Sequence, residues 1–422
     1  TEVALGASLN GHPSCVFFKS VGFNVAADTF VQLGMMELPG GMVIVLGDDP
    51  GANSSQNEQD NRHLARLAYL PVLEPASPQE ILDFYREASG LSRRLKMPVI
   101  LRLTTHVCHA KEKVAFGAWK PAPADDTPRF DPATSGPYIP LTHLVFPLKR
   151  KALARLEAVR EWGDLPSSTL HQRVDHGNRA RGVITSGFPF LSLTDVLEGC
   201  GQPPDLLKLG LIYPLPRKLV RDFLASHEEV LILEELDDTL ELDLKALAWD
   251  AGLKTRILGK QEIEDWINEY TPDKVRGILH RAWPDLISLP AAVTTSTLSR
   301  RAPQLCPGCG HRSAFYAVKQ ALKDTAITVA DIGCHTLGFL PPYRLGQVLV
   351  CMGHGIGTAS GLSLFNKTRA VVSFLGDSTF FHAGIPGIVN ALFNNHRQTL
   401  IIMENGTTAM TGHQDLPSIG KN

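Results

Sequence analysis

The strongest constraint on the fold is an alternation of short apolar runs with longer helical stretches along the 422 residues. Gly, Pro, Asp or Asn bound the apolar runs, which is typical of buried strands. We expect strands over 42–46, 99–103, 182–186, 206–212, 230–233, 327–330, 348–351, 371–375 and 400–403. Amphipathic stretches predict helices over 78–95, 216–226 and 313–322. Strands that alternate with helices predict an α/β protein with doubly wound parallel sheets.

Two stretches without a sustained apolar period, 119–147 and 289–307, are interpreted as connections. They divide the chain into α/β units over 1–113, 181–288 and 300–422, with a linker region over 114–180. The first unit opens within a helical pattern, the last stops soon after a strand, and there is no initiator Met. We therefore expect both outer units to be truncated parts of a longer chain.

Composition excludes several classes of partner. The formal net charge is −2, which argues against a nucleic-acid arm or a membrane-binding polybasic face. No apolar run approaches the roughly 20 residues of a membrane span, and the first residues do not form a signal peptide. The seven cysteines are too few and too dispersed for a disulfide framework. We expect no nucleic-acid or membrane partner and a reducing, cytoplasmic location.

A compact strand–helix–strand unit is expected over 371–403. Its helix has Pro386 in the first turn, where proline is well tolerated. The buried stripe of this helix is predicted to be Ile388, Val389, Leu392 and Phe393.

Polar residues stand where the two strands of this unit end. Asp377, flanked by Gly376 and Ser378, follows the first strand, and Asn405 and Thr407 follow the second. Because parallel strands end at one edge of a sheet, we expect Asp377 and Asn405 to lie side by side. With the carbonyl of Thr407 they would form an oxygen half-shell that suits Mg²⁺ bound to phosphate.

A second loop also suits a phosphate. Gly353, His354 and Gly355 follow an expected strand and open a helix, whose N-terminus attracts anions. Each feature alone is weak, because Gly-Asp commonly makes a turn and Gly-x-Gly commonly serves tight packing. The residue chemistry at both strand ends together favours a diphosphate held through a divalent cation.

Three cysteines form a candidate metal or redox site. Cys306 and Cys309 precede a predicted helix, and Cys334 follows the strand expected at 327–330. A redox pair at a helix N-terminus, a zinc site completed by a His, and an iron–sulfur cluster all remain open. Cys351 is the nearest further thiol, but its place in an expected strand favours a core role.

Histidines and carboxylates elsewhere have competing interpretations. His311 and His335 stand in the cysteine-bearing loops and could contact a diphosphate or handle protons, or could be structural. Glu234 and Glu235 follow an expected strand, and we expect a solvated strand end there. Residues 19–28, which follow the apolar run 15–18, are expected to form a loop, and the polar segment 48–60 is by composition a solvated surface loop.

The order Gly376-Asp377-Ser378, helix, Asn405 resembles the thiamine diphosphate signature, in which Gly-Asp-Gly precedes Asn by about one strand–helix–strand unit. Ser378 stands where the signature has its second Gly. Longer strings resemble the large (alpha) subunit of indolepyruvate:ferredoxin oxidoreductases, a family of thiamine-dependent 2-oxoacid oxidoreductases. These strings cover 21–28, 48–60, 380–387 and 407–414, and the similarity is weakest over 119–180.

The resemblance implies a transketolase-like fold. Its domains would be a pyrimidine-binding type over 1–113, a transketolase C-terminal type over 181–288 and a diphosphate-binding type over 300–422. It shifts the interpretation of segment 48–60 towards an active-site or domain-contact loop. It also implies that the glutamate that activates the cofactor lies upstream of Thr1.

The resemblance further implies thiamine diphosphate, Mg²⁺ and a [4Fe–4S] cluster as cofactors. Cys306, Cys309 and Cys334 would hold the cluster, with a fourth ligand absent or beyond Asn422. The residues expected to contact the cofactor are Gly353, His354, Gly355, Gly376, Asp377, Ser378, Asn405, Thr407, His311 and His335.

The implied reaction is oxidative decarboxylation of an arylpyruvate, such as indolepyruvate, to an aryl-acetyl-CoA. The implied partners are a small (beta) subunit, ferredoxin, coenzyme A, the 2-oxo acid and a second large subunit. A non-oxidative thiamine-dependent decarboxylase and a non-catalytic fragment that binds other subunits are the alternatives.

Overall fold

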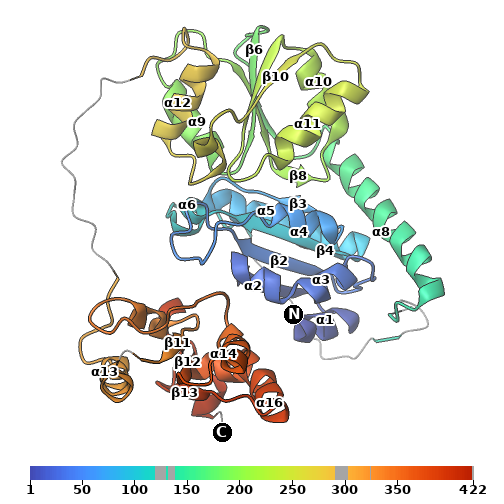
Figure 1. The fold of residues 1–422 in the computed structure, drawn as a ribbon. Coiled ribbons are helices and arrows are strands. Elements are labelled where there is room, and N and C mark those ends of the chain that lie inside the picture. Colours follow the sequence, from blue (N-terminus) through green and yellow to red (C-terminus); the bar gives the residue numbers. More distant parts are fainter. Residues whose placement is uncertain (119–129, 132–137, 290–302, 324, 421–422) are drawn as a thin grey trace. The chain divides into compact units, whose positions relative to one another are not determined.

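The computed structural model describes residues 1–118, 130–131, 138–289, 303–323 and 325–420 (Figure 1). The chain divides into two compact units, Thr1–Ala292 and Val293–Asn422, and each is considered by itself. Both expected connections, 119–147 and 289–307, lie partly outside the described residues. The division into three domains stays a prediction.

The first sheet of unit 1, sheet A, has the order β1-β2-β4-β3-β8. All neighbours are parallel except β3 and β8, which are antiparallel. Its strands are β1 (Ser14–Lys19), β2 (Met42–Gly47), β3 (Val72–Leu73), β4 (Pro98–Leu103) and β8 (Leu211–Tyr213). The helices of this part are α1 (Glu2–Leu9), α2 (Ser20–Val25), α3 (Ala27–Leu33), α4 (Arg62–Leu67), α5 (Pro78–Leu95) and α6 (Thr105–His109).

The second sheet of unit 1, sheet B, has the order β10-β9-β6-β7-β5, with only β5 antiparallel. Its strands are β5 (Gln172–Val174), β6 (Arg181–Ser186), β7 (Asp205–Leu209), β9 (Glu229–Leu233) and β10 (Arg256–Leu258). Figure 1 shows α9 and α12 on one face and α10 and α11 on the other. These helices are α9 (Pro189–Leu197), α10 (Arg217–Ala225), α11 (Thr239–Asp250) and α12 (Pro272–Ala282), and the short helix η1 covers Ile263–Trp266.

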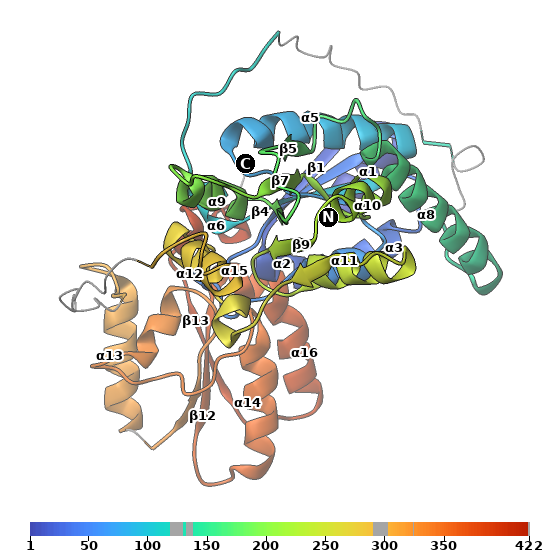
Figure 2. The ribbon, with the colours of Figure 1, turned by 90° about the horizontal axis from the view of Figure 1, so that it is seen from above.

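Unit 2 is built on sheet C, the parallel sheet β11-β12-β13. Figure 2 shows α13 on one side of this sheet and α14 and α16 on the other. Its strands are β11 (Ile327–Val329), β12 (Val371–Gly376) and β13 (Thr399–Met403), and its longer helices are α13 (Gly310–Leu322), α14 (His354–Phe365) and α16 (Ile385–Phe393). The short helices are η2 (Cys334–Phe339), α15 (Asp377–Thr379), η3 (Phe380–Gly384), η4 (Ala409–Thr411) and η5 (Pro417–Ile419).

Alternate strand residues enter different cores, which is the signature of a sheet covered on both faces. Val183 of β6 packs in the core with α9 and α12, whereas its neighbour Ile184 packs in the core with α10 and α11. In sheet A, Ile44 faces the α2–α4 side and Val43 faces α5. The predicted α/β fold class is confirmed. No helix in the described part of the chain is long and apolar enough to cross a membrane.

Three predicted elements differ from the structure. The strand expected over 206–212 is broken at Gly210, where a Cβ would lie 2.2 Å from the carbonyl oxygen of Leu170, and the chain passes from sheet B to sheet A. The strand expected over 348–351 is wrong, because only Val348 forms a bridge and Cys351 is exposed. Residues 19–28, expected as a loop, form α2 and the start of α3.

The buried stripe expected on α16 is also wrong. Val389, Leu392 and Phe393 are 61%, 72% and 83% exposed. The helix instead approaches α14 through Gly387, where a Cβ would lie 3.1 Å from the Cβ of Ile356. Small residues therefore form the contact, and the large apolar face has no partner within the described part of unit 2.

The region 114–180, expected as a linker, contains the 22-residue helix α8 (Thr142–Gly163) as well as β5. Pro147 lies inside α8. Because proline usually interrupts a helix, the sequence does not predict this helix. Buried residues recur along one face of α8 at Leu148, Ala152, Leu156 and Val159.

We expect Gly34→Ala to destabilise unit 1 by about 3 kcal/mol, because overpacking against rigid backbone forces the chain apart. A Cβ at Gly34 would lie 1.7 Å from the carbonyl oxygen of Ala68. The matched control is Gly90→Ala in α5, where nothing lies within 4 Å and the gain in helix propensity should stabilise by about 0.5–1 kcal/mol. Urea unfolding measures both, and equal midpoints for Gly34→Ala and the parent would contradict this packing.

Candidate functional site

The ends of β12 and β13 bring Asp377 and Asn405 together. The Asp377 side chain is buried, and its Oδ2 accepts hydrogen bonds from the backbone N–H groups of Asn405 (2.9 Å) and Gly406 (2.8 Å). Its Oδ1 accepts the N–H of Ser378 at 2.8 Å. The Asn405 Oδ1 accepts the N–H of Thr407 at 3.2 Å. The expected convergence of 377 and 405 is therefore present.

This edge suits a hard cation. A carboxylate oxygen can accept more than one interaction, so the backbone donors leave lone pairs on Asp377 available. Asn405 is exposed, so an ion could reach its amide oxygen. The donor set of carboxylate, amide and carbonyl oxygens is the one Mg²⁺ prefers, with water and phosphate completing the octahedron.

Two neutral histidines lie beside Asp377. The rings of His311 and His335 are parallel within 9°, with centroids 6.4 Å apart. Burial, with a contribution from His311, lowers the pKa of His335 to about 4 against the opposing effect of Asp377. Burial also lowers the pKa of His311. Both imidazoles are therefore uncharged at neutral pH, and the buried Nε2 of His335 has no hydrogen-bond partner among the described residues.

Gly376 allows the approach of His335 to the strand end. A Cβ at Gly376 would lie 3.0 Å from Cε1 of His335, and one at Gly333 would lie 2.7 Å from the same atom. These glycines leave room for the imidazole next to the Asp377 edge. The sequence-predicted residues 311, 335, 376, 377, 378, 405 and 407 thus gather around one edge of sheet C.

The glycine loop before α14 is already occupied by a carboxylate that sequence reasoning missed. The N–H of Gly353 donates to both oxygens of Asp331 at 3.0 Å, and the N–H of Gly355 donates at 3.4 Å. Burial raises the pKa of Asp331 to about 6. The sequence feature that points to Asp377, an aspartate directly after an expected strand, is also present at Asp331. An anion at this loop would compete with Asp331, so the loop is a weaker phosphate candidate than the 377–405 edge.

His354 also has partners of its own. Its Nε2 accepts the N–H of Val350 at 3.0 Å, and its Nδ1 lies 2.9 Å from Oγ1 of Thr358. These contacts fix the start of α14 and give His354 a structural role in this structure.

The cysteines lie close enough to influence one another. Burial raises the pKa of the Cys334 thiol, and the Cys309 and Cys306 thiols add to this. Within the described residues, the three sulfur atoms do not all come within 4.8 Å of one another. A tetrahedral zinc ion with bonds of about 2.3 Å would draw its thiolates to about 3.8 Å apart, whereas cluster thiolates bind separate irons and stand further apart. In the described residues these thiols therefore do not form a preformed zinc site.

In unit 1, the expectation of a solvated strand end at Glu234 and Glu235 is wrong. Both side chains are buried, only 2% and 4% exposed. They directly follow β9, which lies beside the central strand β6 of sheet B, and Glu234 accepts a hydrogen bond from Arg62 at the start of α4. Asp48, Asp49 and Asp60, at the two ends of the polar segment 48–60, are likewise buried. Its middle is exposed at Asn53, Ser54, Gln56 and Asn57, so only the ends of the segment differ from a solvated loop.

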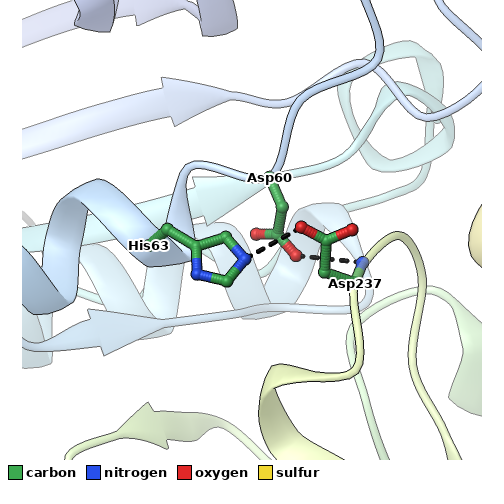
Figure 3. Close-up of side chains that lie close together, drawn as sticks. All are labelled: Asp60, His63 and Asp237. Atoms are coloured by element: carbon green, nitrogen blue, oxygen red, sulfur yellow. Dashed lines mark hydrogen bonds and ion pairs between the residues drawn. The ribbon is translucent and has the colours of Figure 1, made fainter.

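Asp60, His63 and Asp237 form one group of potential ligands within 4.8 Å in the described part of the chain (Figure 3). His63 Nε2 lies 2.8 Å from Asp237 Oδ2, and the N–H of Asp237 donates to Asp60 at 3.3 Å. However, Nε of Arg62 lies 2.9 Å from both Asp60 oxygens. Burial opposes ionisation of Asp60, but Arg62 and Arg102 outweigh it and hold its pKa well below the usual range. Because the guanidinium already occupies the carboxylate, we assign no metal here.

Two family models match the chain. The model "Pyruvate flavodoxin/ferredoxin oxidoreductase, thiamine diP-bdg" matches residues 1–139, and "Thiamine pyrophosphate enzyme, C-terminal TPP binding domain" matches 331–422. The second match contains Asp377, Asn405 and Thr407.

Curated relatives match almost the whole chain. The indolepyruvate oxidoreductase subunit IorA of Methanothermobacter thermautotrophicus is 41% identical over 99% of this chain and 68% of its own length. The subunit of the same name from Pyrococcus abyssi is 33% identical over 100% of this chain and 68% of its own.

Among solved structures, a 2-oxoglutarate:ferredoxin oxidoreductase from Magnetococcus marinus covers 68% of this chain and 55% of its own, with a TM-score of 0.49 and 16% identity. That similarity is too low to carry an argument. The sequence relatives are sufficient: the chain belongs to the family of indolepyruvate oxidoreductase subunit IorA, an enzyme family built on thiamine-diphosphate-binding domains.

Proposed function

We propose that this chain is the thiamine-dependent subunit of an oxidoreductase that decarboxylates an arylpyruvate of the indolepyruvate type. The observation that carries the proposal is the convergence of Asp377 and Asn405 at the ends of neighbouring parallel strands. It lies inside the residues matched by the thiamine pyrophosphate model.

In the proposed site, Asp377, Asn405 and the carbonyl of Thr407 would hold Mg²⁺ together with the diphosphate of the cofactor. Thiamine diphosphate supplies the carbanion chemistry that releases CO₂. Gly376 and Ser378 line the same edge, and Gly353, His354 and Gly355 form a more distant, weaker part of it. The neutral imidazoles of His311 and His335 can donate or accept a hydrogen bond without adding charge.

The oxidative half of the proposal places a [4Fe–4S] cluster on Cys306, Cys309 and Cys334. Two electrons from each decarboxylated acid would leave singly for two ferredoxins, and the acyl group would pass to coenzyme A as its thiol loses a proton. We further propose a small beta subunit as partner, a second copy of this subunit, and a cytoplasmic location. Magnesium, the cluster and these partners remain predictions.

The test is titration of the full chain with thiamine diphosphate in the presence and absence of Mg²⁺. Metal-dependent heat of binding is expected, and no heat under either condition would remove the thiamine proposal and favour a fragment that only binds other subunits. Anaerobic reconstitution followed by iron and acid-labile sulfide analysis tests the cluster. Binding of thiamine diphosphate without iron or sulfide would instead favour the non-oxidative decarboxylase.

A further inference from the structure

Unit 1 contains a buried charge cluster that the proposed reaction does not use. It joins the carboxyl ends of sheet A strands to those of sheet B. Its members are each at most 9% exposed, and they are Asp48, Asp60, Arg62, Glu74, Arg102, Glu234 and Glu235.

Arg102 of β4 ties together the two ends of segment 48–60. Its Nε lies 2.7 Å from Asp48 Oδ2, and its Nη2 lies 3.9 Å from Asp60 Oδ1. Its Nη1 donates to Glu74 at 2.5 Å. Asp48 is the first residue of the segment and Asp60 is the last, so the guanidinium of Arg102 holds the two ends of the segment together.

Arg62 ties the same segment to sheet B. It pairs with Asp60 and Glu234, and its Nη2 donates to the carbonyl oxygens of Glu235 (2.9 Å) and Asp237 (2.8 Å). Arg62 therefore joins the end of segment 48–60 to the residues that follow β9.

The buried charge cluster has more acids than bases. Five carboxyl groups face two guanidinium groups. Among the described residues, the only further base bonded to the cluster is Lys260, whose Nζ donates to the carbonyl oxygen of Glu234 at 2.6 Å. A buried carboxylate without a compensating charge is costly and takes up a proton instead. Apart from Asp60, no cluster member belongs to a group of metal-ligand atoms within 4.8 Å among the described residues. We therefore expect a bound proton, and not a metal ion, to neutralise the excess negative charge of the cluster.

Glu235 is the member placed to carry that proton. Its Oε1 accepts the N–H of Tyr270 at 2.9 Å, while its buried Oε2 has no partner among the described residues. The charged groups that face it are Arg102 and Glu74 from sheet A, Glu269 beside Tyr270, and Lys274 from α12. Burial raises the pKa of Glu235 to about 7, although Tyr270 and Arg102 oppose this.

We propose that a proton exchanged by Glu235 controls how firmly Arg102 holds segment 48–60, so that the segment loosens when Glu235 ionises. The Nη2 of Arg102 has no hydrogen-bond acceptor among the described residues. An ionised Glu235 repels Glu74 and competes for this guanidinium, which weakens its hold on Asp48 and Asp60.

The segment that would loosen is an ordered polar network. Asp49 accepts the N–H of Ser54 at 2.9 Å and lies 3.4 Å from the Nζ of Lys19. Gln59 accepts a hydrogen bond from Asn24 at 2.8 Å. An effect on catalysis rests on the proposed function, but the loosening itself does not.

The test is hydrogen exchange of the 48–61 amides in the full chain at pH 6 and pH 8, corrected for intrinsic rates. If Glu235 has a pKa near 7 when the segment is closed and an ordinary value when it opens, the opening equilibrium should rise about tenfold over this interval. Glu235→Gln mimics the protonated acid and should abolish the rise. The control Glu228→Gln, on the exposed residue before β9, should behave as the parent.

A parent-like pH trend in Glu235→Gln, or no trend in the parent, overturns the proposal. If Glu235→Gln does not fold, infrared spectra of the parent with ¹³C-labelled glutamate test whether a buried glutamic acid loses its proton. The band of a protonated carboxylic acid should disappear between pH 6 and 8, and its absence overturns the proposal. Thiamine diphosphate titration at pH 6 reports separately on the proposed function, because Glu235→Gln should bind the cofactor as the parent does.

Discussion

The Asp377→Asn variant is expected to bind thiamine diphosphate with Mg²⁺ at least about a hundredfold more weakly than the parent, since even residues that only support metal ligands change affinity by about 10–100-fold. Asparagine keeps the size of the side chain and one oxygen for the N–H groups of Asn405 and Gly406. It removes the negative charge that would face the divalent cation. Calorimetric titration of both proteins measures the difference.

Glu404→Gln is the control for this prediction. Glu404 is exposed and directly precedes Asn405, so the variant removes one charge at the same strand end without removing a proposed ligand. Affinity should change by less than about threefold, because an exposed charge is well screened. Equal losses in both variants would mean that Asp377 acts only through its charge and does not bind the metal.

Replacing Arg102 with methionine should lower the free energy of unfolding of unit 1 by about 3–5 kcal/mol, because it leaves buried carboxylates without their partner. The guanidinium is 1% exposed and pairs with Asp48 and Glu74. The loss should shrink as the pH falls towards 5, because burial raises the pKa of Asp48 and a protonated Asp48 no longer needs a cation. Urea unfolding at pH 5 and pH 7.5 measures both effects.

Arg256→Met is the control, because it makes the same substitution at an arginine whose ion pair is exposed. Arg256 pairs with Glu229 at 2.8 Å, but its side chain is 71% exposed. An exposed ion pair contributes about 0–1 kcal/mol, so this variant should be nearly as stable as the parent. If Arg102→Met were equally mild, the buried charge cluster would not hold unit 1 together.

The elements with a strong apolar pattern were predictable. The helix expected over 78–95 has those bounds in the structure, with Ser77 as its N-cap and Pro78 in its first turn. The strand expected over 371–375 is extended by one residue, to Gly376. Here the local signals of capping, proline placement and burial agree, so no tertiary information was needed.

Elements whose burial depends on a distant partner were not predictable. The apolar residues of α16 have the spacing of a buried stripe, yet Gly387 makes the contact with α14 and Leu392 and Phe393 remain exposed. Periodicity shows that a helix has an apolar face, but it does not show what covers that face.

By itself, the sequence determined the α/β class, the family and the meeting of Asp377 and Asn405, because parallel strands must end at a common edge. Only the tertiary structure decided that Glu234 and Glu235 are buried opposite Arg62 and Arg102, and that Asp331 occupies the glycine loop of α14. A carboxylate after a strand looks the same in sequence whether it meets water, a cation or an arginine. Its protonation and its role depend on residues that are distant along the chain and become neighbours only on folding.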